Sequence, residues 1–144
     1  MSSVMAESSR RTRPALQGSL WIAQIILAAL FGMAGGMKTF LAVPDLLAHG
    51  INYASDLPWW LLRFIGVAEM AGAIGIVLPA ATRVLPRLTP LAALGFTVLQ
   101  LLAIGFHATR GELAFALPLN LPLLGLSLFA LWGRGAKLPI QART

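Results

Sequence analysis

The residues of this chain that could do chemistry lie inside stretches that are otherwise apolar. Glu69 stands near the middle of the apolar run from Pro58 to Leu78, and His107 lies late in another such run. A carboxylate and an imidazole on facing helices can share or relay a proton, because histidine titrates near neutral pH. Acid–base catalysis with Glu69 and His107 as catalytic residues is therefore one chemistry that the sequence could support.

Further polar residues share this apolar setting: Lys38, Arg63, Gln100 and Asn120. If each run is a helix that rises about 1.5 Å per residue, Glu69 lies roughly 17 Å from the Pro58 end of its run. The basic residues discussed below predict that this end faces outward. Lys38, Arg63, His107 and Asn120 lie closer to that end. We therefore predict a pocket in the outer half of a membrane, where these side chains and Glu69 hydrogen-bond the carbonyl groups of a small lipophilic ligand such as a quinone.

The same residues also allow roles without any ligand. Glu69 with Lys38 or Arg63 could form an ion pair that only fixes helix packing. His107 could be an interfacial residue, and Gln24, at the other end of the first apolar run, is expected to be interfacial. We expect no metal site, because the chain has two histidines, of which His49 falls in a predicted loop, and no cysteine. The lack of cysteine excludes iron–sulfur clusters, thiolate metal sites and disulfide exchange.

The elements that must position these residues are predicted from composition. Of 144 residues, 58% are hydrophobic and only 11% are charged, which is far below the charged share of soluble domains. The apolar runs cover about 19–41, 58–78, 90–109 and 113–132, and a run of about 20 residues spans the hydrocarbon core of a bilayer. We therefore predict an all-α, polytopic membrane protein, a four-transmembrane-helix bundle over residues 19–135. Residues 1–18 are expected to be a disordered cytoplasmic tail and residues 136–144 a second cytoplasmic tail.

Basic residues predict the orientation of this bundle. The amino-terminal tail holds three, the loop between the second and third runs two, and the carboxyl-terminal tail three, which is eight of the eleven lysines and arginines. Basic residues favour the cytoplasmic side, so both termini are expected there, in a multi-pass protein of a bacterial-type inner (plasma) membrane. The formal charge of +6 does not indicate a nucleic-acid partner, since these residues flank membrane runs and form no basic patch on a soluble module.

Motifs in the four runs resemble those of the DoxX-like family of small membrane proteins. The first run holds Ala34-Gly35-Gly36-Met37-Lys38 late in its length, and the second holds Ile65-Gly66-x-x-Glu69-x-x-Gly72-Ala73. His107 late in the third run and Asn120 early in the fourth complete the pattern, which covers roughly residues 19–135. Relatives include a membrane subunit of a thiosulfate:quinone oxidoreductase and small proteins that assemble with redox enzymes. The resemblance thus implies a membrane subunit of a redox system, with Lys38, Glu69, His107 and Asn120 as the polar positions.

Three functions follow from these observations. The first is a quinone-binding membrane subunit that works with a separate soluble or membrane redox partner. The partner is needed because a chain without cysteines or a cofactor motif cannot hold electrons itself. No covalently bound cofactor is expected. The second is a self-sufficient membrane enzyme of the isomerase or cyclase type, with Glu69 and His107 as acid and base. The third is a structural or assembly protein. The ligand and the oligomeric state do not follow from the sequence.

Overall fold

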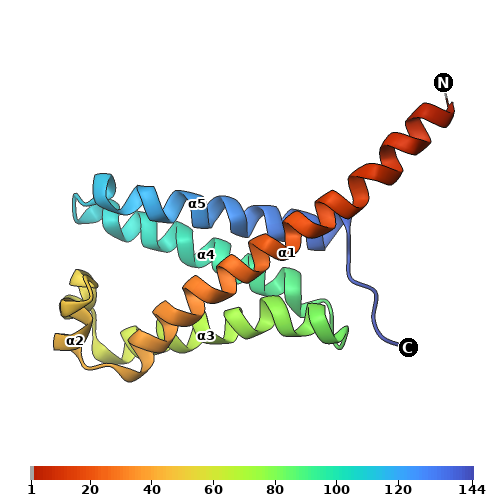
Figure 1. Cartoon of the computed structure of the whole chain (residues 1–144). Helices are drawn as coiled ribbons and strands as arrows, with labels where there is room; N and C mark the ends of the chain where they lie inside the picture. The colour runs from red at the N-terminus through yellow and green to blue at the C-terminus, as the bar shows by residue number, and fades with distance from the viewer. Residues whose placement is uncertain (1) are drawn as a thin grey trace.

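Four long helices lie side by side in the computed structural model, which describes residues 2–144, with side chains described from Arg13 onward (Figure 1). They are α1 (Ser2–Phe40), α3 (Trp59–Thr82), α4 (Leu88–Thr109) and α5 (Leu113–Trp132). The shorter elements are α2 (Val43–Ala48), the 3₁₀ helix η1 (Asn52–Ser55) and the π-helical turn η2 (Gly133–Lys137). The predicted all-α class and four-helix bundle are confirmed.

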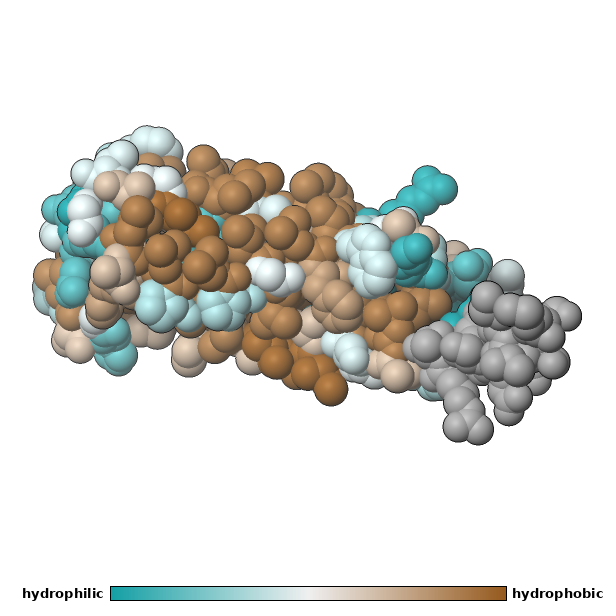
Figure 2. Space-filling model, turned by 90° about the horizontal axis from the view of Figure 1, so that it is seen from above, coloured by the Kyte–Doolittle hydropathy of each residue, from teal (hydrophilic) through white to brown (hydrophobic). Residues whose placement is uncertain are grey.

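Each long helix contains a segment long and apolar enough to cross a membrane: Arg13–Phe40, Trp59–Thr82, Leu88–Thr109 and Leu113–Lys137. Large apolar side chains that face outward, such as Ile22, Phe64 and Leu102, are more than half exposed. On the face that Figure 2 shows, hydrophobic residues form a broad brown band over the middle, and hydrophilic residues gather toward the two ends. An apolar surface of this extent is stable in contact with lipid and not with water, so the chain is a multi-pass membrane protein.

The four long helices form a closed bundle, because α1 and α4 each pack against both α3 and α5. Across the middle, the ring of Phe31 on α1 stacks on the ring of Phe96 on α4, with centroids 3.9 Å apart. Leu27, Ile76 and Ala93 are buried around this pair. The middle of the core, around this aromatic pair, is therefore apolar.

The two ends of the bundle differ in their covering. At one end, which we call the connection end, lie residues 41–58 and 110–112. There Leu46 of α2 and Ala54 of η1 pack on Leu62 of α3, so the connection folds over the bundle. The opposite end, which we call the tail end, holds residues 83–87 and 133–144 (Figure 1).

Helical structure extends into both predicted tails. Within the segment 1–18, α1 begins at Ser2 and continues through Pro14 without a break; Met1 lies outside the described residues. The fourth span also continues beyond residue 132, as η2, to Lys137. From there the chain runs back along the loop after α3, where the Arg143 amide donates to the Arg83 carbonyl at 2.9 Å. The carboxyl-terminal segment is thus attached to the bundle.

Candidate functional site

Lys38 and Glu69 form an ion pair between α1 and α3. The Lys38 Nζ lies 2.7 Å from each carboxylate oxygen of Glu69. The two side chains are only 5% and 8% exposed. A charged side chain within a membrane span needs a partner to offset its lost hydration, and here each residue supplies the countercharge of the other.

Two glycines bring these charges together. A Cβ on Gly35 would lie 2.6 Å from the Gly66 carbonyl oxygen, and a Cβ on Gly66 would lie 2.8 Å from the Gly35 carbonyl oxygen. Because no side chain fits between the backbones, α1 and α3 can cross this closely only with glycine at both positions. Lys38 follows Gly35 by three residues on α1, and Glu69 follows Gly66 by three residues on α3. Each charged residue therefore lies on the crossing face of its own helix, one turn after the glycine.

Arg63 joins this cluster through the backbone. Its Nη1 donates to the Lys38 carbonyl oxygen at 2.6 Å. That carbonyl is among the last four of α1, which have no partner within their own helix. Arg63 therefore holds the end of α1 in place, and three of the predicted ligand-binding residues, Lys38, Arg63 and Glu69, come together in the structure.

His107 lies in a second network, at the connection end. Its Nδ1 is 3.1 Å from Oε2 of Glu112, and the ring of Tyr53 approaches edge-on at 5.6 Å between centroids. Arg110 donates to Glu112 through Nε at 2.9 Å and Nη2 at 2.8 Å, and its Nη1 pairs with Asp56. This network joins the connection of residues 41–58 to the turn between α4 and α5.

The charges of this network set the pKa of Glu112. Hydrogen bonds from Arg110, followed by that of His107, lower the pKa of Glu112 from 4.5 to about 2. The hydrogen bonds to Glu112 and Asp56 in turn raise the pKa of Arg110 above its ordinary value. Glu112 is therefore an ionised partner for His107, which the sequence prediction missed. Its only sequence signal was a pair of opposite charges two residues apart in a short loop.

Gln100 and Asn120 stand apart from both networks. Gln100 is 4% exposed, and its Oε1 has no hydrogen-bond partner among the described residues. Counted from the connection end, it lies about 14 Å deep on α4, while Glu69 lies about 15 Å deep on the neighbouring α3. The half-buried Asn120 donates to the Ala116 carbonyl of its own helix at 3.0 Å.

The predicted site residues thus divide into groups. Within the described part of the chain, no hydrogen bond connects Glu69 to His107, Gln100 or Asn120. Gln100 shares the depth of the ion pair, whereas His107 belongs to the surface network. That these residues line one ligand pocket stays a prediction.

The tail end holds buried polar residues that sequence reasoning missed. Gln24, which is predicted to be interfacial, is fully buried inside the bundle at this end. Its Nε2 donates to the Ile76 carbonyl at 2.6 Å, and its Oε1 accepts a hydrogen bond from Nε of Arg134 at 2.7 Å. Arg134, counted above as a tail charge, is 2% exposed. A helical spacing of buried positions, Leu20, Ala23, Gln24 and Leu27, was the available signal for Gln24.

Metal ligands do not gather in this structure. From Arg13 to the carboxyl terminus, no group of three or more histidine, aspartate or glutamate side chains is placed to hold a metal ion. The ion pair, the His107 network and the buried Gln24–Arg134 contact are the sites that remain for chemistry or binding.

Comparison with known proteins places most of the chain in one family. Residues 22–130 match the DoxX-like family. The matched segment includes the Lys38–Glu69 pair and His107 and ends before Arg134. No curated protein and no solved structure matches the chain.

Proposed function

Because this chain belongs to the DoxX-like family, we propose that it is a membrane subunit of a redox system that binds a small lipophilic ligand of the quinone type beside the Lys38–Glu69 pair. The observation that carries this proposal is the pair itself, two opposite charges held at 5% and 8% exposure within membrane-spanning helices. Ionisable residues inside spans are costly, and they mark functional sites by default.

The chemistry of these groups suits such a ligand. The Lys38 Nζ is a donor for a quinone carbonyl, and the Glu69 carboxylate is an acceptor for the hydroxyl of the reduced form. At nearly the same depth as Glu69, the Oε1 of Gln100, which has no hydrogen-bond partner among the described residues, offers a second acceptor. The electrons would come from a partner protein, because the chain has no cysteine to hold a cluster or a redox-active disulfide.

A structural role is the second candidate, and the tight glycine crossing favours it. With both carboxylate oxygens of Glu69 2.7 Å from Lys38, the pair is already satisfied without a ligand. It would then fix how α1 packs on α3. The enzyme alternative, with Glu69 and His107 as acid and base, gains no support from the geometry, since His107 contacts Glu112 instead.

Thermal unfolding with a short-chain quinone separates the first two candidates. At saturating quinone we expect the melting temperature of the full-length protein in detergent to rise by a few degrees, because a ligand bound only to the folded state stabilises it. The rise should disappear in Glu69→Gln and shrink in Gln100→Leu.

Glu112→Gln is the matched control, since it removes a carboxylate from the same end of the molecule but from the surface. Its quinone-dependent rise should equal that of the wild type. A wild type without any rise, or a rise that survives Glu69→Gln, would contradict the proposed site and leave the structural role.

A further inference from the structure

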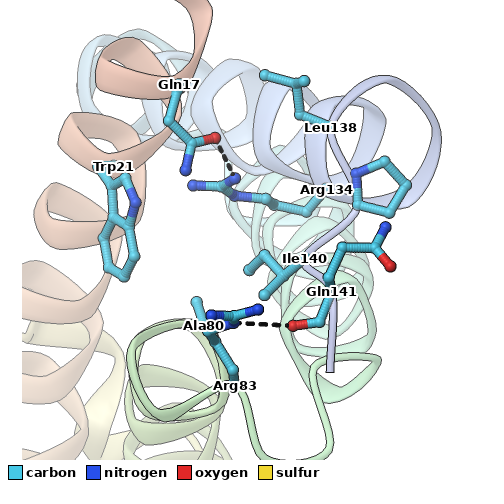
Figure 3. Close-up of a pocket in the computed structure, with 9 residues that line it drawn as sticks. Gln17, Trp21, Ala80, Arg83, Arg134, Leu138, Ile140 and Gln141 are labelled. Carbon is cyan, nitrogen blue, oxygen red and sulfur yellow. Dashed lines mark hydrogen bonds between the residues drawn. The ribbon is translucent and has the colours of Figure 1, made fainter. Parts of the chain in front are cut away.

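The tail end contains a cavity of about 310 Å³ between α1, α3 and the carboxyl-terminal segment. Figure 3 shows Arg134 and Arg83 on opposite sides of it, with Trp21 on one flank and Ile140 near the middle. The two arginines come from distant parts of the chain, one from η2 and the other from the residue that follows α3. The cavity is separate from the Lys38–Glu69 pair, and none of its lining residues belongs to the proposed quinone site.

Among the described side chains, Arg134 is a buried cation that has no countercharge. Its Nε and Nη1 donate to the amide oxygens of Gln24 and Gln17, at 2.7 and 2.8 Å. Its Nη2 is buried and has no hydrogen-bond partner among the described residues. Amide oxygens satisfy two donors of the guanidinium but leave its positive charge unbalanced, which is costly at 2% exposure.

The surroundings of the cavity are also positive. The acidic residues with described side chains are Asp45, Asp56 and Glu112 at the connection end and Glu69 between α1 and α3. By contrast, Arg83, Lys137 and Arg143 lie at the tail end with Arg134. An anion that entered the cavity would therefore meet only attraction from the charged side chains described there.

The walls of the cavity fit an anion that carries an apolar part. The guanidinium of Arg134 stacks over the indole of Trp21 at 5.5 Å, and Leu138, Pro139 and Ile140 line the side formed by the carboxyl-terminal segment. Arg83 uses its Nε for the Gln141 carbonyl at 3.1 Å, and its side chain is otherwise exposed. Guanidinium groups are matched to phosphate oxygens in charge and in geometry.

We propose that the tail-end cavity binds a phosphate group between Arg134 and Arg83. Two sources share this chemistry, the headgroup of an anionic membrane lipid and a free phosphate compound. Trp21 lies in the tail-end half of its span, and tryptophan favours the headgroup level of a membrane, so the lipid is the source that the location favours. The site also explains why an arginine stays buried next to two glutamines, because the missing charge is supplied by the ligand.

Binding measurements on the full-length protein in maltoside micelles, which contain no phosphate, test this site. Phosphatidylglycerol binding is followed by native mass spectrometry and inorganic phosphate binding by calorimetry. In Arg83→Gln and Arg134→Gln we expect the dissociation constant of the phosphate-bearing ligand to rise about tenfold, the loss of one charge-assisted hydrogen bond. Arg83 is exposed, so its variant should fold even if Arg134→Gln does not.

Lys137→Gln is the matched control, because Lys137 carries the same charge on η2 but lies over the Trp132 ring and does not line the cavity. Its affinity should equal that of the wild type. Binding of phosphatidylglycerol alone assigns the site to a headgroup, and binding of inorganic phosphate assigns it to free phosphate compounds. Failure of both to bind the wild type, or an equal loss in Lys137→Gln and Arg83→Gln, overturns the proposal.

Discussion

Lys38 and Arg134 are both buried cations, but their hydrogen-bond partners differ in charge. Lys38 meets the carboxylate of Glu69, at 2.7 Å from both oxygens, within the segment shared with the DoxX-like family. Among the described residues, the guanidinium of Arg134 donates hydrogen bonds only to the amide oxygens of Gln24 and Gln17, and Arg134 lies beyond that segment. The first charge is balanced inside the fold, whereas the second is left for a ligand or lipid to balance.

The difference in partners predicts different stability effects at the two sites. A buried ion pair contributes little net stability, yet removal of one partner leaves a charge that nothing offsets. A buried cation held by neutral groups has no such partner to lose. The two sites should therefore respond unequally to single substitutions, and this inequality can be measured.

Glu69→Leu should have the largest effect. It leaves the Lys38 ammonium buried at about 5% exposure without a countercharge, which should lower the free energy of unfolding by about 3–5 kcal/mol. Thermal unfolding in detergent measures the loss. The double variant Lys38→Met with Glu69→Leu removes both charges and should recover most of the stability, and a double variant as unstable as the single one would show that the pair is not what the fold depends on.

Gly35→Ala should come next, because it tests the crossing that creates the pair. The added Cβ would lie 2.6 Å from the Gly66 carbonyl oxygen and 2.8 Å from the Glu69 Cβ, so α1 and α3 must separate, at a cost of about 1–3 kcal/mol. Gly36→Ala adds the same methyl group one residue later, where nothing lies within 4 Å. Its melting temperature should stay at or slightly above that of the wild type, and equal losses in both variants would argue against the crossing.

The sequence predicted those features that follow from the bilayer and from helical spacing. Span lengths follow from membrane thickness, and the shared half of the membrane makes Lys38 and Arg63 the two candidate partners of Glu69. The structure pairs Glu69 with Lys38. The partner of His107 could not be predicted, because it depends on how the connection of residues 41–58 returns to the turn at Arg110.

Gln24 and Arg134 were missed for a different reason. Gly133-Arg134-Gly135 is typical of a helix end followed by a tail, since glycine commonly follows the last helical residue. Instead the chain continues as η2, and Gly133 packs against Leu20 so closely that a Cβ there would overlap its side chain. This contact joins α1 to the end of α5 beside the place where Arg134 meets Gln24.

Arg134→Gln should have a smaller effect than either change at the Lys38 site. Two hydrogen bonds are lost, but so is an unbalanced buried charge, and we expect a net loss of about 1 kcal/mol in maltoside without added lipid or phosphate. Urea or thermal unfolding, run beside Glu69→Leu, gives the comparison directly. A loss as large as that of Glu69→Leu would show that a countercharge already lies within the chain, which would remove the contrast between the two sites.

Glu112 offers the smallest effect, and it extends the comparison to a charge at the surface. Hydrogen bonds, chiefly from Arg110, lower its pKa in the folded protein from 4.5 to about 2. A depressed carboxyl pKa stabilises the folded state above about pH 4.5, and this contribution is lost as the pH falls toward 2. The melting temperature of the wild type should therefore exceed that of Glu112→Gln by a small, constant margin at neutral pH, because exposed pairs contribute little. The margin should shrink between pH 4.5 and 2, whereas a margin that does not change with pH would mean that the ionised form of Glu112 is not what joins α4 to α5.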